Sequence, residues 1–314
     1  MLSSLLIRLS SLQYSLKKFA GVNYPETSDR PGAIPYNEAQ NHPLQGKRIL
    51  ITGAGRGIGK RLAIGLASKG AIVGLVARTK AEIDLAHLEI QHAGGVSLRL
   101  PGDVRELDRM VMAAERMRAS FGGTDILICA AGVQGPIGLM HEAETRAWRE
   151  TFETNVFGVM HACRAVLPEM VQRRAGKIIV VSGGGSLTPR PHFSAYAASK
   201  AAVVRFVETI ASEYAEHNVQ ANCLAPGGTY TNMTDEILAA GEHRAGWKEI
   251  EDARQVRMTG GVPLEKQLQL AVFLSSEDSN HVSGKLLRYD DDWKKLARGS
   301  VSPELYTLRR ITKS

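Results

Sequence analysis

Apolar and polar residues follow one another in a repeating order between residues 47 and 289. Short runs made almost wholly of Val, Ile, Leu and Ala alternate with longer stretches in which apolar residues recur at helical spacing. Strands that are apolar throughout are buried on both faces, which is typical of a parallel sheet covered by helices. The strands are predicted at residues 48–53, 71–78, 96–103, 125–132, 177–182 and 219–227.

This order predicts an α/β protein. Because crossovers between parallel strands are right-handed, we expect a single-domain, Rossmann-like doubly wound parallel sheet of about seven strands with helices on both faces. The pattern has no internal repeat and no break that would mark a second domain. It predicts one domain at residues 45–290, an extension and linker at 1–44, and a tail at 291–314.

The first 25 residues carry an amphipathic pattern of their own. They include Arg8, Lys17 and Lys18 and no acidic residue. An organelle transit peptide, a helix lying on a membrane, and an extension packed on the domain or on a partner all fit this pattern. Six apolar residues at spacings of three and four would form one face of a helix: Leu2, Leu5, Leu9, Leu12, Leu16 and Phe19.

Composition narrows the class of protein. No stretch reaches the ~18 consecutive apolar residues of a membrane-spanning helix, although the N-terminal helix would be able to touch a membrane. The net charge of +7 is spread along the chain, so we expect no nucleic-acid partner. The predicted location is cytoplasmic, with the mitochondrial matrix as the alternative if residues 1 to about 25 are a transit peptide.

The chain has three cysteines, Cys129, Cys163 and Cys223, which are far apart in the sequence. Their spacing matches neither a zinc site nor a disulfide framework, so we expect reduced, buried thiols. Asp290, Asp291 and Asp292 form the one acidic run that would suit a metal, but such a run near a chain end is more often solvated. No metal site is predicted.

Four glycines follow the first predicted strand, in the stretch "ITGAGRGIGKRLA". A strand, a glycine turn and a helix in this order bring the backbone close to a pyrophosphate, whose charge lies at the helix N-terminus. The sequence therefore predicts a dinucleotide site at this turn. It is formed by Gly53, Gly55, Arg56, Gly57, Ile58 and Gly59.

The residues at the end of the second predicted strand indicate which dinucleotide the site binds. A site for NAD(H) usually has Asp or Glu there to hold the ribose hydroxyls. This chain has Ala77 at that place, followed by Arg78 and Thr79. An arginine pairs with a 2′-phosphate, which an acid would repel, and Arg56 offers a second positive group. We therefore predict NADP(H) rather than NAD(H).

Tyr196 and Lys200 are four residues apart, so they share one face of a helix. A phenol has a pKa near 10 and transfers protons poorly at neutral pH unless a neighbouring cation stabilises the phenolate. The pair follows the fifth strand, at the carboxyl edge of the sheet where ligands bind in such folds. This placement favours a catalytic role.

Several motifs in this order resemble the short-chain dehydrogenase/reductase family over about residues 47–284. They are the glycine turn with Thr52, Asp103 after the third strand, Asn155 in "TNVFGV", a serine after the fifth strand, Tyr196 with Lys200, and Pro226-Gly227 followed by Thr231. The resemblance implies a homodimer or homotetramer and a tetrad of Asn155, Ser182, Tyr196 and Lys200.

The resemblance also implies a role for each of these residues. Tyr196 would be the general acid and base, and Ser182 would hydrogen-bond the substrate oxygen. Lys200 would lower the pKa of the tyrosine and hold the ribose, and Asn155 would anchor a proton-relay water. The remaining cofactor contacts implied are Asp103 at the adenine, and Val104, Ala131, Gly132, Pro226, Gly227, Thr229 and Thr231.

Three serines lie near the tyrosine. Ser182 is fourteen residues before it, at the strand end, and Ser186 is ten before it, beyond three glycines. Ser194 is on the tyrosine's helix or just before it, where an N-cap role would be structural. We select Ser182, with Ser186 as the alternative.

Other segments frame the predicted pocket. Residues 228–262 form a long polar segment, helical in parts, that we expect to be a lid over the substrate. The lid contains Glu236, Trp247, and His243 with Arg244, of which His243 is expected at the surface. Arg190 and His192 border the pocket and are candidates for substrate contact. The fourth strand ends in "CAAG" where the family usually has "NNAG", so Cys129 and Ala130 must pack there as small apolar residues.

Together these features predict an NADP(H)-dependent oxidoreductase that interconverts a ketone or aldehyde and an alcohol by hydride transfer. A nucleotide-binding sensor, or an epimerase or dehydratase on the same fold, is the alternative. The substrate would be a small-molecule carbonyl or alcohol, whose identity the sequence does not give, because one fold serves many substrates.

Overall fold

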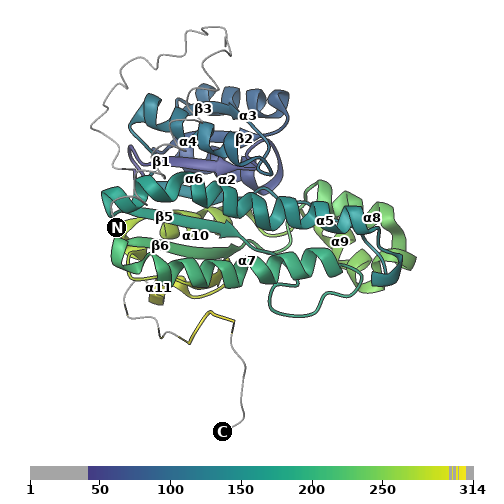
Figure 1. Cartoon of the computed structure of the whole chain (residues 1–314). Helices are drawn as coiled ribbons and strands as arrows, with labels where there is room; N and C mark the ends of the chain where they lie inside the picture. Colours follow the sequence, from purple (N-terminus) through teal and green to yellow (C-terminus); the bar gives the residue numbers. More distant parts are fainter. Residues whose placement is uncertain (1–41, 297–298, 300–301, 303, 309–314) are drawn as a thin grey trace, which may run out of the picture. The chain divides into compact units, whose positions relative to one another are not determined.

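The computed structural model describes residues 42–296, 299, 302 and 304–308 (Figure 1). The amphipathic N-terminal pattern and the transit-peptide alternative therefore lie outside the described residues. The strands are β1 (Arg48–Thr52), β2 (Ile72–Ala77), β3 (Val96–Pro101), β4 (Ile126–Cys129), β5 (Gly176–Val181), β6 (Val219–Ala225) and β7 (Lys285–Arg288).

Within the described residues, these strands form one parallel sheet in the order β3-β2-β1-β4-β5-β6-β7. The chain starts in the middle, winds outward to β3, returns to β4 beside β1, and winds outward again to β7. A crevice forms at such a reversal, outside the carboxyl ends of the neighbouring strands. The predicted doubly wound α/β fold is confirmed.

Helices cover both faces of the sheet (Figure 1). Residues of α4, α6 and α7 pack in one core cluster with one set of strand side chains, and residues of α2, α3 and α10 pack in a second cluster with the alternate set. The helices are α2 (Gly57–Ala67), α3 (Lys80–His92), α4 (Leu107–Phe121), α5 (Thr145–Phe152), α6 (Gly158–Arg173), α7 (Ser194–Glu213), α8 (Asn232–Ala245), α9 (Trp247–Thr259), α10 (Leu264–Ser275) and α11 (Trp293–Leu296), with the short helices η1 (Met140–Glu142), η2 (Glu153–Phe157), η3 (Ala215–His217) and η4 (Glu277–Ser279).

A third, smaller apolar cluster lies apart from these two. It joins Phe193 and Tyr196 to Ile237 of α8 and Ile250 of α9. Figure 1 shows α8 and α9 beyond the end of the sheet, beside α5. The predicted lid is therefore two helices that pack on the start of α7.

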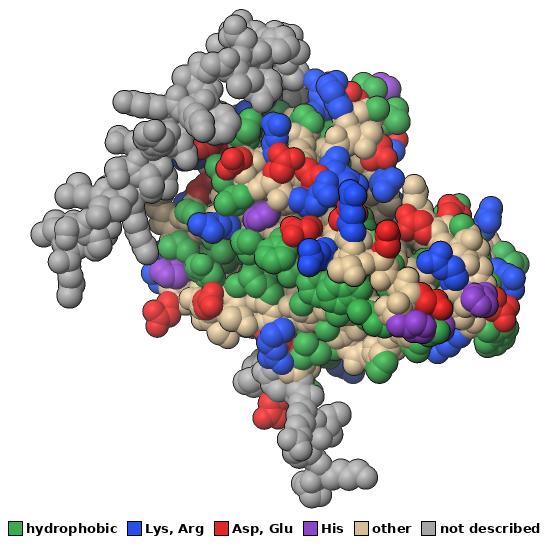
Figure 2. Space-filling model, turned by 45° about the vertical axis from the view of Figure 1, so that its right-hand side comes forward, with side chains coloured by type: hydrophobic (Ala, Val, Ile, Leu, Met, Phe, Trp, Pro, Cys, Tyr) green, Lys and Arg blue, Asp and Glu red, His purple; other side chains and the backbone are tan. Residues whose placement is uncertain are grey.

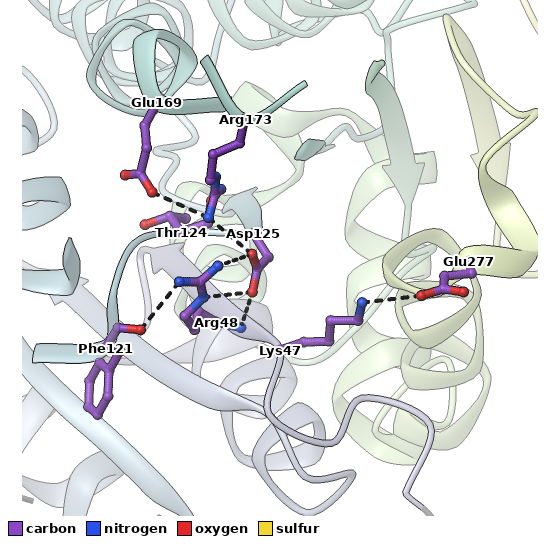
Figure 3. Close-up of polar contacts among 8 residues, drawn as sticks. All are labelled: Lys47, Arg48, Phe121, Thr124, Asp125, Glu169, Arg173 and Glu277. Carbon is purple, nitrogen blue, oxygen red and sulfur yellow. Dashed lines mark hydrogen bonds and ion pairs between the residues drawn. The ribbon is translucent and has the colours of Figure 1, made fainter. Parts of the chain in front are cut away.

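The amino end of the sheet is held by ion pairs (Figure 3). Asp125, just before β4, accepts hydrogen bonds from the backbone N–H and the guanidinium of Arg48 at the start of β1. Arg173, at the end of α6, contacts the same carboxylate and also Glu169. Burial opposes ionisation of Asp125, but the hydrogen bonds from Arg48 prevail and keep its pKa below the usual value. This cluster fixes β1 beside β4 at the edge opposite the glycine turn.

Described residues of the tail pack on the domain. Lys285 Nζ of β7 donates hydrogen bonds to the carbonyls of Ser302 (2.8 Å) and Leu305 (2.9 Å), and the Leu286 N–H donates to the Tyr306 carbonyl (2.7 Å). The tail therefore lies along the outer strand of the sheet.

Charged side chains of both signs are interspersed on the face shown in Figure 2, around apolar side chains near its middle. This agrees with a net charge carried mainly by solvated surface residues. The helices of the described ranges include none with the length and apolar character to cross a membrane.

Candidate active site

A cavity of about 660 Å³ lies at the carboxyl ends of the strands, where the loops after β1, β2, β4, β5 and β6 meet. Its wall contains every residue that the sequence predicts for cofactor binding, with the exception of Asn155. Ser182, Tyr196 and Lys200 line the same cavity. The fold thus gathers residues from eight separate stretches of the chain into one site: 53–59, 78–79, 103–104, 131–132, 182, 196, 200 and 226–231.

The glycine turn leaves no room for a side chain at Gly53 or Gly59. A Cβ on Gly53 would lie 2.6 Å from the Ala131 backbone nitrogen, and one on Gly59 would lie 2.2 Å from the Gly53 carbonyl oxygen. Gly53 also has a φ of +70°, which disfavours any other residue. The first turn of α2 carries no acidic residue and no side-chain cap, so its N–H groups are left for an anionic ligand. The turn fits a dinucleotide pyrophosphate.

The part of the cavity beside β2 holds charges of both signs. Arg56 and Arg78 line it, and so does Glu82 of α3. Glu82 Oε1 lies 3.7 Å from Arg56 Nη1. A Cβ on Gly55 would lie 2.9 Å from Glu82 Oε2 and 3.3 Å from Ala77 Cβ, so this carboxylate lies next to Ala77. An acid from α3 thus reaches the place where the strand itself has alanine.

Asp103 lines the cavity and is held in place by Arg105. The Arg105 guanidinium donates to both carboxylate oxygens at 2.7–3.1 Å, and the Arg105 N–H donates to Oδ1 at 3.0 Å. Burial opposes ionisation of Asp103, but these hydrogen bonds keep its pKa below the usual value. Asp103 is therefore an ionised, oriented acceptor.

Tyr196 lies in the first turn of α7 and is 8% exposed. Its hydroxyl lies against Gly183, where a Cβ would be 2.5 Å from Tyr196 Oη. One turn later, Lys200 Nζ donates a hydrogen bond to the Val181 carbonyl (2.9 Å) and lies 5.6 Å from the centroid of the tyrosine ring. The end of β5 and the start of α7 thus hold phenol and ammonium together at the cavity.

Burial has opposite effects on these two groups. It raises the pKa of the Tyr196 phenol; Arg190 opposes this rise and Glu249 reinforces it. Burial also lowers the pKa of Lys200 to about 8. The lysine is therefore mostly protonated at neutral pH. Lowering of the tyrosine pKa by Lys200 stays a prediction.

The three serines occupy different environments. Ser182 is 2% exposed and lines the cavity, and its hydroxyl has no hydrogen-bond partner among the described residues. Ser186, 7% exposed, also lines the cavity. Ser194 lies on the tyrosine's helix, which is one of the two positions expected for it, but it is not the N-cap: α7 begins at Ser194 and Phe193 is the cap residue. The Ser194 hydroxyl accepts a hydrogen bond from Trp148 Nε1 (3.3 Å).

Asn155 lies behind the cavity wall rather than in it. It is fully buried in the π-helical turn η2. Its carboxamide exchanges two hydrogen bonds with the Val133 backbone (2.9 and 3.0 Å) and donates a third to Ser199 Oγ (3.0 Å). The side chain thus braces the segment after β4 against α7. It has no free amide N–H left for the predicted water.

The lid contributes acids to the cavity. Glu236 of α8 and Glu249 and Asp252 of α9 line it. Burial raises the pKa of Glu236, and Arg56 opposes this. His243, Arg244 and Trp247 are exposed, as expected for His243, and none lines the cavity.

The two candidates for substrate contact before Tyr196 differ. Arg190 lines the cavity, but Glu249 binds its guanidinium through two hydrogen bonds of 2.8 and 2.7 Å. His192 is absent from the wall and packs against Gly246 between the lid helices.

The departures from the family pattern have simple structural outcomes. The cysteines Cys129, Cys163 and Cys223 are buried and free, as expected. The Arg288 guanidinium binds Asp290, the Arg288 backbone N–H donates to Asp291, and Asp292 lies 2.9 Å from Lys295 Nζ. Asp290 and Asp292 are thus in local ion pairs, and Asp291 accepts a local backbone hydrogen bond.

Sequence reasoning missed several polar residues of the wall, among them Glu82, Gln134 and Glu249. Glu82 and Glu249 lie in ordinary amphipathic helices, and only tertiary packing brings them to the cavity. Gln134 is 2% exposed, and its Nε2 lacks a hydrogen-bond partner in the part of the chain that is described. Its position just after the fourth strand was the one available signal.

Comparison with known proteins gives consistent matches. The sequence model of the family described as short chain dehydrogenase matches residues 47–241. The 2,3-dihydro-2,3-dihydroxybenzoate dehydrogenase of Bacillus subtilis (strain 168) is 32% identical over 76% of this chain and 93% of its own. The 5-keto-D-gluconate 5-reductase of Escherichia coli (strain K12) is 35% identical over 79% of this chain and 95% of its own.

A solved structure shows the same fold with a nucleotide. It is a gluconate 5-dehydrogenase from Burkholderia cenocepacia J2315 in complex with NADP and tartrate, with a TM-score of 0.70 and 30% identity. The match covers 79% of this chain and 94% of that one.

Proposed function

The chain belongs to the short-chain dehydrogenase family and is an oxidoreductase acting on CH–OH groups, and we propose that it uses NADP(H), with Tyr196 as general acid and base. The observation that carries this proposal is the meeting of three features in one cavity. These are the glycine turn with Arg56, Arg78 after β2, and the buried Tyr196 with Lys200.

Each group has a defined task. The bound nicotinamide supplies or accepts the hydride. The glycine turn would hold the pyrophosphate, Arg56 and Arg78 the 2′-phosphate, and Lys200 the nicotinamide ribose. The Tyr196 hydroxyl donates its proton to the carbonyl oxygen during reduction and takes it back from the alcohol during oxidation.

Two buried donors without partners suit an oxygen-rich substrate. Ser182 Oγ and Gln134 Nε2 line the cavity and have no partner among the described residues. An unpaired buried donor carries a cost of about 1–3 kcal/mol. Substrate oxygens that accept these hydrogen bonds would remove it. A hydroxylated ketone or aldehyde therefore fits better than a plain hydrocarbon ketone.

The direct test is nucleotide turnover by purified protein. NADPH and NADH oxidation would be measured with aldehydes, ketones, keto sugars and keto acids, and NADP⁺ reduction with the matching alcohols. We expect NADPH-preferring turnover with hydroxylated substrates best. Tight NADPH binding without turnover on any of these would favour the sensor alternative. Absence of binding for both nucleotides would overturn the proposal.

Cofactor choice depends on Arg78 and Glu82. Arg78→Ala should lower kcat/KM for NADPH by about tenfold or more, the loss expected for a charge-assisted hydrogen bond, and leave NADH nearly unchanged. Glu82→Gln should shift preference further toward NADPH, because it removes an acid that pairs with Arg56 and would repel a phosphate. Steady-state kinetics with both nucleotides measure this ratio. An unchanged ratio in both variants would contradict the assignment.

Ser182→Ala should lower kcat/KM by about tenfold, the value of one buried neutral hydrogen bond. Its thermal stability should not fall, since the Ser182 hydroxyl has no partner within the described structure to lose. Ser186→Ala is the matched control. Activity assays and thermal melts of the two variants separate the serines; a larger activity loss in Ser186→Ala would reverse the choice.

A further inference from the structure

Arg190 and Glu249 form a bridge across the cavity. Arg190 lies in the loop between β5 and α7, and Glu249 lies in the first turn of α9. The guanidinium donates Nε–H to Glu249 Oε1 (2.8 Å) and Nη2–H to Oε2 (2.7 Å). Both side chains are largely buried, at 16% and 24% exposed. A two-point pair of this kind fixes orientation as well as distance.

The same guanidinium lies over two aromatic rings. Its Cζ is 4.0 Å from the centroid of the Phe193 ring and 5.3 Å from that of Tyr196. Cations at such distances from ring faces are attracted to them. The Arg190 side chain also runs over the glycine tract, where a Cβ on Gly185 would be 3.2 Å from its Cβ. Arg190 is therefore packed on the phenol rather than reaching into solvent.

The lid and the tyrosine share an apolar core beneath this ion pair. Tyr196 and Phe193 pack with Ile250 and Ala253 of α9. Gly183 closes the other side of the phenol, with no side chain between the backbone and Tyr196 Oη. The ring is thus held between the glycine tract, the α9 core and Arg190, and Glu249 ties Arg190 to the lid.

We infer that Arg190 and Glu249 are positioning residues, forming a clamp that fixes the Tyr196 phenol to the lid helix α9. This inference rests on the proposed role of Tyr196. The clamp connects seating of the lid over substrate to placement of the proton donor, which no sequence motif indicates.

The two charges of the clamp affect the pKa of Tyr196. The charged groups facing the Tyr196 ring are Arg190 from the loop, Glu249 from α9 and Lys200 from α7 itself. Burial has the largest effect on the pKa of Tyr196 and raises it; Glu249 reinforces this rise and Arg190 opposes it. The pair therefore holds the ring with two charges of opposite effect, while burial keeps the phenol protonated at neutral pH for carbonyl reduction.

The test is a titration of Tyr196 by NMR of protein labelled at the tyrosine ζ-carbon, with the resonance assigned by its loss in Tyr196→Phe. Arg190→Gln should raise the pKa of Tyr196, and Glu249→Gln should lower it, each by about 0.5–1 pH unit. The double variant should return close to wild type. Each of the three variants also breaks the bridge, so kcat should fall in all of them, including the double variant whose pKa is restored. Two charges that merely face the ring would leave kcat of the double variant near wild type.

Two further variants are the controls. Glu251→Gln, two residues along α9 in an exposed pair with Arg254, should leave the pKa of Tyr196 unchanged. Arg190→Lys keeps the positive charge but cannot make both hydrogen bonds to Glu249. It should therefore leave the pKa of Tyr196 near the wild-type value and lower kcat, with a smaller change in KM. If Arg190→Gln fails to fold, Glu249→Gln and Arg190→Lys still test the clamp.

Wild-type kcat in the double variant, or no shift of the Tyr196 pKa in Glu249→Gln, would overturn the clamp. The titration needs neither nucleotide nor substrate. Failure of the proposed function would appear separately: wild-type protein would show no turnover, although the pKa of Tyr196 shifted in the variants as expected.

Discussion

Replacing Tyr196 with Phe is expected to lower kcat/KM for carbonyl reduction by about a thousandfold, within the 10²–10⁴ range of general acid catalysis. The change removes one oxygen from a ring that is 8% exposed and packed on Gly183, Phe193 and α9. The ring itself would stay in place, so the loss reports proton transfer rather than packing. NADPH oxidation with the best substrate of the panel measures it.

Nucleotide binding is the internal control for this variant. The dissociation constant for NADPH should change little, because the glycine turn and Arg78 lie on other loops. A second sign is the pH profile of alcohol oxidation, in which the limb that belongs to Tyr196 should disappear. Activity within tenfold of wild type would mean that another group supplies the proton.

Gly183→Ala is expected to lower kcat/KM by about a hundredfold, because a displacement near 1 Å at a reacting group has an effect of that order. The added Cβ would lie 2.5 Å from Tyr196 Oη and 3.3 Å from its Cζ. Gly183 is not among the residues with positive φ, so alanine strains no backbone there. The whole effect would come from pushing the phenol away. Kinetics with saturating NADPH measure it.

Gly184→Ala is the matched control. It lies next in the same tract and also lacks a positive φ, but its Cβ would meet Arg190 Cδ at 3.8 Å and Arg190 Nε at 4.0 Å, which are ordinary contacts. We expect it to change kcat/KM little and both variants to bind NADPH as wild type does. Equal activity in the two alanine variants would show that the phenol does not need its place against Gly183.

The sequence did not predict that residue 183 faces the Tyr196 hydroxyl. The choice among Ser182, Ser186 and Ser194 depended on counting residues back from Tyr196. The structure shows that the position aimed at the phenol hydroxyl is a glycine, that Ser194 accepts a hydrogen bond from Trp148, and that Ser182 has a buried, unpartnered hydroxyl. Counting gives distance along the chain, but the direction of a side chain depends on how β5 ends and how the loop returns.

The fold, by contrast, was readable from the pattern. The predicted strands overlap β1 to β6. Apolar runs and helical spacing are local signals, and a parallel sheet covered on both faces is the arrangement that buries all of them. The order of the strands in the sheet comes from the structure.

The sequence by itself determined the doubly wound sheet, the glycine turn, and the placement of Tyr196 and Lys200 on one helix face at the carboxyl edge. These features depend on residues close together in the chain. The tertiary structure alone decided that Glu82 lies beside Ala77, that Asn155 braces Val133 and Ser199 behind the cavity wall, and that Glu249 reaches Arg190 across 59 residues. Such contacts depend on how loops and lid helices pack over the sheet, and hydrophobic periodicity carries no information about which polar side chains meet there.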